Sequence, residues 1–280
     1  MRINGTIIDY DKDQRTIDLI YRKRRLKVYF QRANYNRFYK FLSLGVIAVL
    51  QVKWVKKKTG KQLTVSNVIK LSKPSQRGPK LLYSFDQIQQ DTKSFINSLN
   101  YKLFLDFEMS MHPYHKNPSF IQEIIQAGYV LEDKEGNLIE EYSVYIKPTK
   151  HKKLSKRTIK FLDLTQADVD NGVNYKIFYN HFKTVLETYT PAIIVWGKND
   201  AISLKDSYKL NLVPSLAKKT RFVNLLKLHK NVFNYKNDLG LKNAYEMYGY
   251  QASFPQRHDA LEDAYMTKKV FEGFKKTLNN

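Results

Sequence analysis

The stretch Leu103-Phe104-Leu105-Asp106-Phe107-Glu108 decides the fold of this 280-residue chain. Its apolar run is typical of a strand buried in the middle of a sheet. Because side chains alternate along a strand, Asp106 and Glu108 point to the same face. Two carboxylates there repel each other and are costly to desolvate unless a cation binds between them. The stretch therefore predicts a metal site, although a frayed, solvated strand end would fit it equally well.

Two further segments carry acidic residues and a histidine at points where a strand ends or a helix begins. A second apolar strand, 192–196, is followed by Asp200 and a helical pattern, so Asp200 lies at the carboxyl edge of the sheet, where α/β proteins keep their sites. Asp is also a favoured helix N-cap, and that role alone would explain it. The last helix opens at 257–264, with His258 just before its first turn and Asp263 about a turn and a half further along. Both could reach one cleft, although a histidine beside a helix start is usually inert.

Taken together, the segments resemble the DEDDh exonucleases of the ribonuclease-H-like fold. The family's D-x-E motif is matched by Asp106 and Glu108, its second acid by Asp200, and its H-x-x-x-x-D motif by His258 and Asp263. The resemblance covers about residues 100 to 275. It is closest to the branch of the histone-mRNA exonucleases and the bacterial sporulation-inhibitory exonucleases. Residues that look like that branch are Phe120-Ile121-Gln122-Glu123-Ile124-Ile125 and Gly240-Leu241. The stretch 109–112 departs from the threonine-containing segment of many members, and Ser110 could replace that threonine.

The resemblance implies a 3'-5' exonuclease that acts on single-stranded nucleic acid, with RNA favoured over DNA and two Mg²⁺ or Mn²⁺ ions as cofactors. Asp106, Glu108 and Asp263 would hold the ion that carries the nucleophilic water, with Asp106 bridging to the second ion. Asp200 would be a further acid of the metal site. His258 would be the general base, because its ordinary pKa lies near neutral pH. Hard cations prefer carboxylates, and the chain has no cysteine to offer instead.

The pattern from residue 101 onward predicts a three-layer α/β domain. Strands are expected near 102–108, 122–131, 139–147, 192–196 and 221–225, and helices near 174–188, from 200, near 239–248 and near 259–275. The turn-rich stretch 72–79 marks a boundary. We therefore expect an OB-like domain over residues 1–71, a linker over 72–82, and the exonuclease domain over 83–280.

The first 71 residues predict a small β-barrel. Strands are expected over 3–9, 16–21 and 26–30, a helix over Tyr35 to Leu44, and two more strands over 46–55 and 63–71. This is the element order of an OB-fold, which commonly binds oligonucleotides. Aromatic side chains for base stacking are Tyr10, Tyr21, Tyr29, Phe30 and Trp54, although aromatics on strands more often belong to the core.

Charge points to a polyanionic partner. The net charge is +22, and residues 1–75 hold 18 Lys or Arg against 4 Asp, a net of 18 − 4 = +14. We expect nucleic acid rather than membrane, because no basic amphipathic helix is visible. The predicted phosphate contacts are Arg22, Lys23, Arg24, Arg25, Lys56, Lys57 and Lys58.

The sequence is also compatible with other functions and with other metal ligands. The chain could be a catalytically silent nucleic-acid-binding scaffold or a partner module, for example a ribosome-associated one, although all five motif residues are present. Asp259 and Glu262 could compete with Asp263 for the metal, and Glu123 could orient a ligand. Solvated or structural roles are expected for His112, His115, His151, His181 and His229. No secretory signal or apolar run of membrane-spanning length is visible, so we expect a cytoplasmic protein.

Overall fold

The computed structural model describes residues 1–57, 60–115, 118–251 and 258–280. Lys58, one of the predicted phosphate contacts, lies outside them. The chain divides into a barrel unit, residues 1–92 and 230–237, and a sheet unit, residues 93–229 and 238–280. In the part of the chain described, no helix is both long and apolar enough to cross a bilayer.

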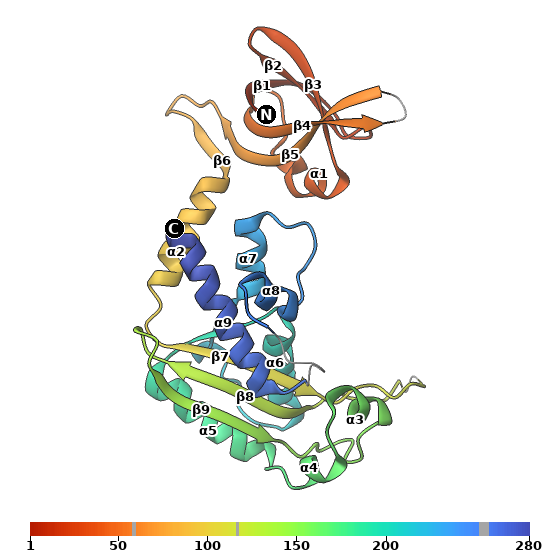
Figure 1. The fold of residues 1–280 in the computed structure, drawn as a ribbon, viewed down its shortest axis with the longest axis vertical. Coiled ribbons are helices and arrows are strands. Elements are labelled where there is room, and N and C mark those ends of the chain that lie inside the picture. The colour runs from red at the N-terminus through yellow and green to blue at the C-terminus, as the bar shows by residue number, and fades with distance from the viewer. Residues whose placement is uncertain (58–59, 116–117, 252–257) are drawn as a thin grey trace. The chain divides into compact units, whose positions relative to one another are not determined.

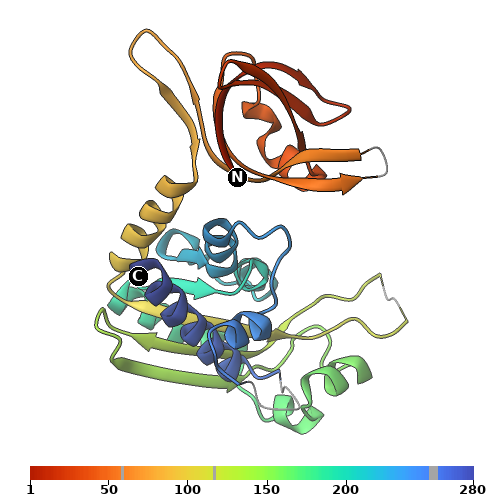
Figure 2. The ribbon, with the colours of Figure 1, turned by 45° about the horizontal axis from the view of Figure 1, so that its top comes forward.

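Five strands of the barrel unit form a closed barrel (Figure 2). They are β1 (Arg2–Asp11), β2 (Thr16–Tyr21), β3 (Arg24–Phe30), β4 (Ile47–Lys57) and β5 (Gly60–Lys73). β1 pairs with β2 and β4, β4 pairs with β5, and a short parallel pairing of Tyr29 with Thr64 closes β3 onto β5. The order of three strands, a helix and two strands confirms the OB-like prediction.

The helix between β3 and β4 differs from the prediction of 35–44. It consists of α1 (Arg32–Phe38) followed by the 3₁₀ turn η1 (Tyr39–Phe41). Tyr35, Phe38 and Leu42 are all buried, so the apolar spacing does mark the core-facing side, but a tighter turn finishes the helix. Two elements that follow the barrel were not expected from the sequence: β6 (Lys80–Ser84), which pairs with β5, and α2 (Phe85–Asn97).

The sheet unit contains a five-stranded sheet in the order β11-β10-β7-β8-β9 (Figure 1). Its strands are β7 (Lys102–Met109), β8 (Ile124–Glu132), β9 (Leu138–Tyr145), β10 (Ala192–Val195) and β11 (Arg221–Asn224). β7 is antiparallel to β8 and parallel to β10, which places it in the centre. This mixed sheet confirms the ribonuclease-H-like α/β prediction.

Helices cover both faces because the side chains of β7 alternate. Leu103, Leu105 and Phe107 pack against α5 (Tyr175–Tyr189) and α6 (Asn199–Leu210). Phe104 faces the other way and meets Phe271 of α9 (Ala260–Asn279), with ring centroids 5.4 Å apart. The remaining helices are α3 (Lys156–Leu162), α4 (Gln166–Asp170), η2 (Ala217–Lys219), α7 (Leu225–Phe233) and α8 (Leu241–Met247).

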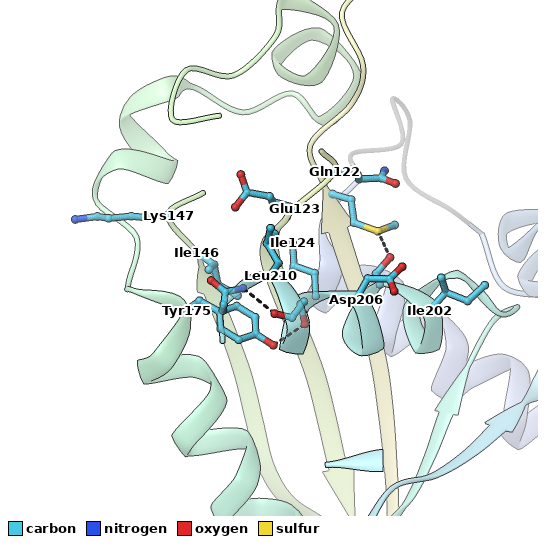
Figure 3. A pocket seen from close by; sticks show the side chains of 13 residues that line it. Gln122, Glu123, Ile124, Ile146, Lys147, Tyr175, Ile202, Asp206 and Leu210 are labelled. Carbon is cyan, nitrogen blue, oxygen red and sulfur yellow. Dashed lines mark hydrogen bonds between the residues drawn. The ribbon is translucent and has the colours of Figure 1, made fainter. Parts of the chain in front are cut away.

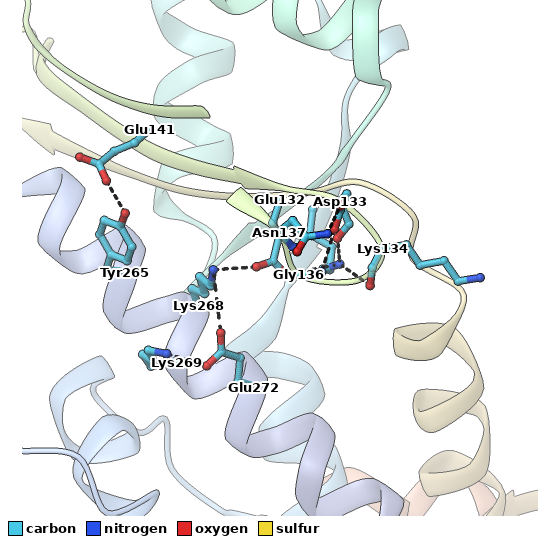
Figure 4. A network of polar contacts seen from close by, with 11 residues as sticks. Glu132, Asp133, Lys134, Gly136, Asn137, Glu141, Tyr265, Lys268, Lys269 and Glu272 are labelled. Atoms are coloured by element: carbon cyan, nitrogen blue, oxygen red, sulfur yellow. Dashed lines mark hydrogen bonds and ion pairs between the residues drawn. The ribbon is translucent and has the colours of Figure 1, made fainter. Parts of the chain in front are cut away.

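A buried ion-pair network fixes the middle of α9 to the sheet (Figure 4). Glu132, at the end of β8, lies 3.3 Å from Lys102 Nζ and 2.9 Å from Lys268 Nζ of α9. Lys102 also donates to the main-chain carbonyl of Asp133. Since both Lys102 and Glu132 are only 3% exposed, removing either partner would leave a buried charge unpaired, which is strongly destabilising.

The start of α9 rests directly on β8 at Gly128. A Cβ atom at this position would lie 2.2 Å from the main-chain nitrogen of Leu261 and 2.3 Å from the carbonyl carbon of Ala260. Gln126, two residues earlier, donates to Asp259 Oδ2 at 2.7 Å and accepts from the main-chain nitrogen of Ala260 at 3.3 Å. The first turn of α9 therefore packs directly against Gly128 and is held by hydrogen bonds to the side-chain amide of Gln126.

We predict that Gly128→Ala lowers the free energy of unfolding by about 1–3 kcal/mol, the usual cost of overpacking, because backbone rather than a flexible side chain blocks the methyl group. The measurement is chemical denaturation. Gly240→Ala is the matched control, since nothing lies within 4 Å of its Cβ position, and it should cost less than about 1 kcal/mol. Equal losses in the two variants would contradict the close approach of α9.

Candidate active site

Two acids come from β7, as the alternation of side chains predicts. Asp106 pairs across the sheet with Gly128, the glycine under α9. Asp106 and Glu108 share the α9 face of the sheet with Phe104, and Glu108 is only 9% exposed. A solvated, frayed strand end is thereby excluded, because both acids pair with residues of β8 and the register shifts only after Glu108.

The segment around the start of α9 adds His258 and Asp263. Asp263 lies in the first turn of α9 and is 8% exposed. Ligand atoms of Glu108, His258 and Asp263 all lie within 4.8 Å of one another. The rings of His258 and Phe161 of α3 stack with centroids 4.4 Å apart and planes 14° apart. The structure therefore brings the first and third motifs together.

Asp200 occupies the first turn of α6, but it does not cap the helix. The N-cap is Lys198, whereas Asp200 Oδ1 accepts a hydrogen bond from the main-chain nitrogen of Phe107 at 3.2 Å. The side chain is 5% exposed and reaches the backbone between the two β7 acids. The capping explanation considered from the sequence is therefore wrong for Asp200.

Burial disfavours ionisation of all four acids, and repulsion by neighbouring carboxylates adds to this effect for Asp106, Glu108 and Asp263. Burial, followed by the charges of Asp200 and then Glu108, holds the pKa of Asp106 well above its ordinary value. Burial raises the pKa of Glu108 to about 8 and that of Asp263 to about 7, in both cases with neighbouring carboxylates adding to the effect. Burial raises the pKa of Asp200 to about 6.

These properties fit a divalent cation. Asp263 Oδ1 is buried and has no hydrogen-bond partner among the described residues, and the donor set is carboxylate oxygen and imidazole, which suits Mg²⁺ or Mn²⁺. Asp106 is not part of the tight group of three ligands, but Asp200, Glu108 and Asp263 all repel its charge. A bound cation would relieve that repulsion.

The competing acids have other partners. Asp259 is the N-cap of α9: its Oδ1 accepts from the main-chain nitrogens of Leu261 and Glu262 at 2.9 and 3.1 Å. Glu262 is exposed. Glu123 is buried and its carboxylate accepts the main-chain N–H groups of Thr149, Lys150 and His151 at 2.6–3.0 Å. This anchoring role of Glu123 depends on residues distant in sequence, so sequence reasoning could not find it.

Residues near the motifs also have structural roles. Ser110 is buried, and its hydroxyl accepts from the main-chain nitrogen of Glu123 at 2.9 Å. His229 is fully buried, and burial lowers its pKa to about 4. His181 lies 2.7 Å from Glu140. His112 and His151 pack against Phe120.

A small cavity of about 90 Å³ lies on the opposite face of the sheet (Figure 3). Its lining includes Met109, Tyr175 and Asp206. Met109 belongs to the β7 face that packs against α5 and α6, whereas Asp106 and Glu108 point the other way. The cavity is therefore separate from the acidic cluster.

The basic residues predicted to contact phosphate are spread over the barrel. Arg22, Lys23 and Arg24 are exposed in or beside the β2–β3 turn, and Lys56 and Lys57 are exposed at the end of β4. Arg25 differs, because its guanidinium forms ion pairs with Asp18 and with Asp9. Among the predicted stacking residues, Phe30 is 5% exposed and belongs to the core, whereas Trp54 is 63% exposed.

A central mixed sheet with clustered carboxylates and a histidine on one buried face defines a nuclease of the ribonuclease-H-like class. A model of the exonuclease family RNase_T matches residues 103–271, so this chain belongs to that family, in which metal dependence is typical. The chain is 33% identical over 174 residues to the probable 3'-5' exonuclease KapD of Bacillus subtilis (strain 168), covering 62% of this chain and 83% of the relative.

Solved structures share the fold. The nuclease domain of 3'hExo, described as a DEDDh family member bound to rAMP, matches with a TM-score of 0.55 at 20% identity, covering 65% of this chain and 93% of that one. A 3'-exonuclease that recognises the histone mRNA stem-loop matches with a TM-score of 0.56 at 18% identity. That match covers 65% of this chain, which spans 64% of the length of the other.

The raised pKa values predict how stability depends on pH in EDTA. A carboxyl whose pKa is raised in the folded state contributes stability below its unfolded pKa, near 4, and loses it as pH rises through the folded pKa. The values of about 6, 7 and 8 for Asp200, Asp263 and Glu108 place this loss between pH 4 and pH 8. Asp106→Asn removes one repelling charge and should raise Tm above wild type at pH 8, by roughly 2–6 °C, and by less at pH 5.

Thermal unfolding followed by fluorescence gives the comparison. Mn²⁺ should raise the wild-type Tm more at pH 8 than at pH 5, because ligands must be deprotonated to bind metal, and the variant should respond less. A variant that is less stable than wild type at pH 8 in EDTA would show that the acids do not repel one another.

Proposed function

We propose that this chain removes nucleotides one at a time from the 3' end of single-stranded nucleic acid, with RNA favoured over DNA. The observation that carries the proposal is the group formed by Glu108, His258 and Asp263, which is flanked by Asp106 and Asp200. The direction is supported by the relative KapD, a probable 3'-5' exonuclease. The preference for RNA is supported by two structural neighbours, whose names mention histone mRNA and rAMP.

Asp106, Glu108, Asp200 and Asp263 would hold two Mg²⁺ or Mn²⁺ ions, with Glu108 and Asp263 closest to His258. When bound, the ions neutralise the phosphate charge, lower the pKa of the attacking water and stabilise the leaving oxygen. The protein's own contribution is to fix the carboxylates, each on a different rigid element or strand position. Like-charge repulsion between them makes the site bind cations in preference to staying empty at neutral pH.

His258 would accept the proton of the attacking water. Its side chain is half-buried, and burial lowers its pKa, so the imidazole is neutral and able to accept a proton near neutral pH. The stack on Phe161 holds the ring beside Glu108 and Asp263. A silent scaffold would not require this clustering, and turnover decides between the two functions.

Two pairs of variants test the site. Asp106→Asn and Asp263→Asn should abolish nucleotide release from a 5'-labelled RNA in Mg²⁺, because each removes a metal ligand's charge without changing side-chain volume. Asp259→Asn should retain most activity, since Asn caps a helix as well as Asp does, and Glu262→Gln should do so because Glu262 is exposed. The opposite ranking would mean that the metal ligands were assigned wrongly, and parallel digests of RNA and DNA strands measure the sugar preference.

We also propose that the barrel unit binds the nucleic-acid backbone. Its basic and acidic side chains line separate parts of its surface, which supports this proposal. A groove beside the β3–β5 closure is lined by Arg15, Arg32, Lys57 and Tyr29, with no acid among its described lining residues. The acids Asp9, Asp11, Asp13 and Asp18 line a different surface depression, together with Lys12 and Lys27. Cations without acids beside an aromatic ring suit phosphates and a stacked base.

The paired substitution of Arg15 and Arg32 by Ser should weaken binding of a thirty-nucleotide strand. The slope of log K against log salt should become shallower by about 0.7 for each phosphate that the variant no longer neutralises. Substituting Lys12 and Lys27 by Ser removes the same charge beside the acids and should change binding little. Fluorescence anisotropy at several salt concentrations makes the comparison, and equal effects of the two pairs would exclude the groove as the binding surface.

A further inference from the structure

The segment 147–161 of the sheet unit carries seven Lys or Arg residues and no Asp or Glu. It leaves β9, runs through the loop 147–155 and continues into α3. All seven basic side chains are exposed, and none forms an ion pair with a carboxylate in the parts of the chain that are described. Uncompensated charge of one sign repels itself and attracts polyanions.

The backbone of this segment is held rigidly. The buried carboxylate of Glu123 accepts three of its main-chain N–H groups and the hydroxyl of Thr149. At the start of α3, Ser155 Oγ donates to the carbonyl of Met111 at 2.9 Å, and the main-chain nitrogen of Met111 donates to Thr158 Oγ1 at 2.9 Å. Since Met111 lies three residues after Glu108, α3 is tied to the continuation of β7.

The segment ends at the active site. Phe161, in the last turn of α3, is 50% exposed and stacks on His258. The two views agree that α3 lies at the end of the sheet where α9 begins (Figures 1 and 2). A row of exposed cations therefore leads along a fixed backbone to the residue proposed as general base.

We propose that residues 147–161 form the surface on which the sugar-phosphate backbone of the substrate strand lies as its 3' end enters the active site. A solvated basic face is the common reason for such a run of charge. However, a solvated face would need neither a buried carboxylate to hold its backbone nor attachment to the catalytic strand. Because phosphate contacts position a strand without reading its bases, this surface binds strands of different sequence alike. The proposal rests on the proposed exonuclease function.

The test compares two quadruple variants of the full-length protein. The first replaces Lys152, Lys153, Lys156 and Lys160 by Gln, which removes the charge and keeps a flexible polar side chain that is slightly shorter. The control replaces Lys176, Lys205, Lys209 and Lys276, four exposed lysines elsewhere on the sheet unit, in the same way. Each variant is measured on a twenty-nucleotide strand and on a nitrophenyl ester of a nucleotide, which is too short to reach the surface.

For the first variant, KM for the strand should rise about tenfold at moderate salt, and the salt dependence of binding should fall by up to roughly 3 in log–log slope, about 0.7 for each phosphate. Its kcat and its rate on the nitrophenyl ester should stay unchanged. The control variant should change KM less than about twofold.

Equal KM values for the two variants would overturn the proposal, as would a slower reaction on the nitrophenyl ester, which would place the lysines in the chemistry. Binding to phosphatidylserine vesicles that is abolished in the first variant, with KM for the strand unchanged, would assign the surface to a membrane instead. If wild-type protein releases no nucleotide from either substrate, the exonuclease proposal fails, and anisotropy of a labelled strand still tests the surface by itself.

Discussion

Mutual repulsion among buried carboxylates is the constraint around which the sheet unit is built. Asp106, Glu108, Asp200 and Asp263 come from β7, α6 and α9, and each would move into water if its element were free to do so. Separate contacts prevent this. The main-chain N–H of Phe107 donates to Asp200. Helix α9 packs on Gly128 of β8, and its Lys268 forms an ion pair with Glu132 of the same strand. The folded state thus keeps together carboxylates whose repulsion is relieved by protonation or by a bound cation.

Local sequence rules predicted the residues of this cluster well, because strand alternation and motif spacing are properties of short segments. Asp106 and Glu108 could be placed on one face from β7 alone. The order of the strands, apart from β6, followed from apolar periodicity, whereas the helices α2, α3, α4 and α7 were not predicted. The catalytic assignment itself remains a proposal. His258 and Asp263 are five residues apart, and only the extended backbone at Asp259 before α9 lets both reach Glu108.

What the sequence could not supply is contact between distant residues. Glu123 looked like a polar position beside a strand, and its four hydrogen bonds to 149–151 depend on how β9 ends. Arg25 looked as free as Arg24, yet Asp18 from the neighbouring strand neutralises it. One strand was missed for a related reason: β6 is only five residues long, and pairing with β5 makes it a strand.

The two edges of the sheet have a consequence for assembly. An unpaired edge strand is a template for another chain, and proteins guard against this by shortening the edge or by placing charge on it. β11 is only four residues long. On β9, Glu140 bonds to Tyr129 and His181 on one face, and Glu141 accepts from Tyr265 on the other. A foreign strand docking there would have to desolvate both carboxylates, so the sheet resists edge-to-edge aggregation even where its backbone is open.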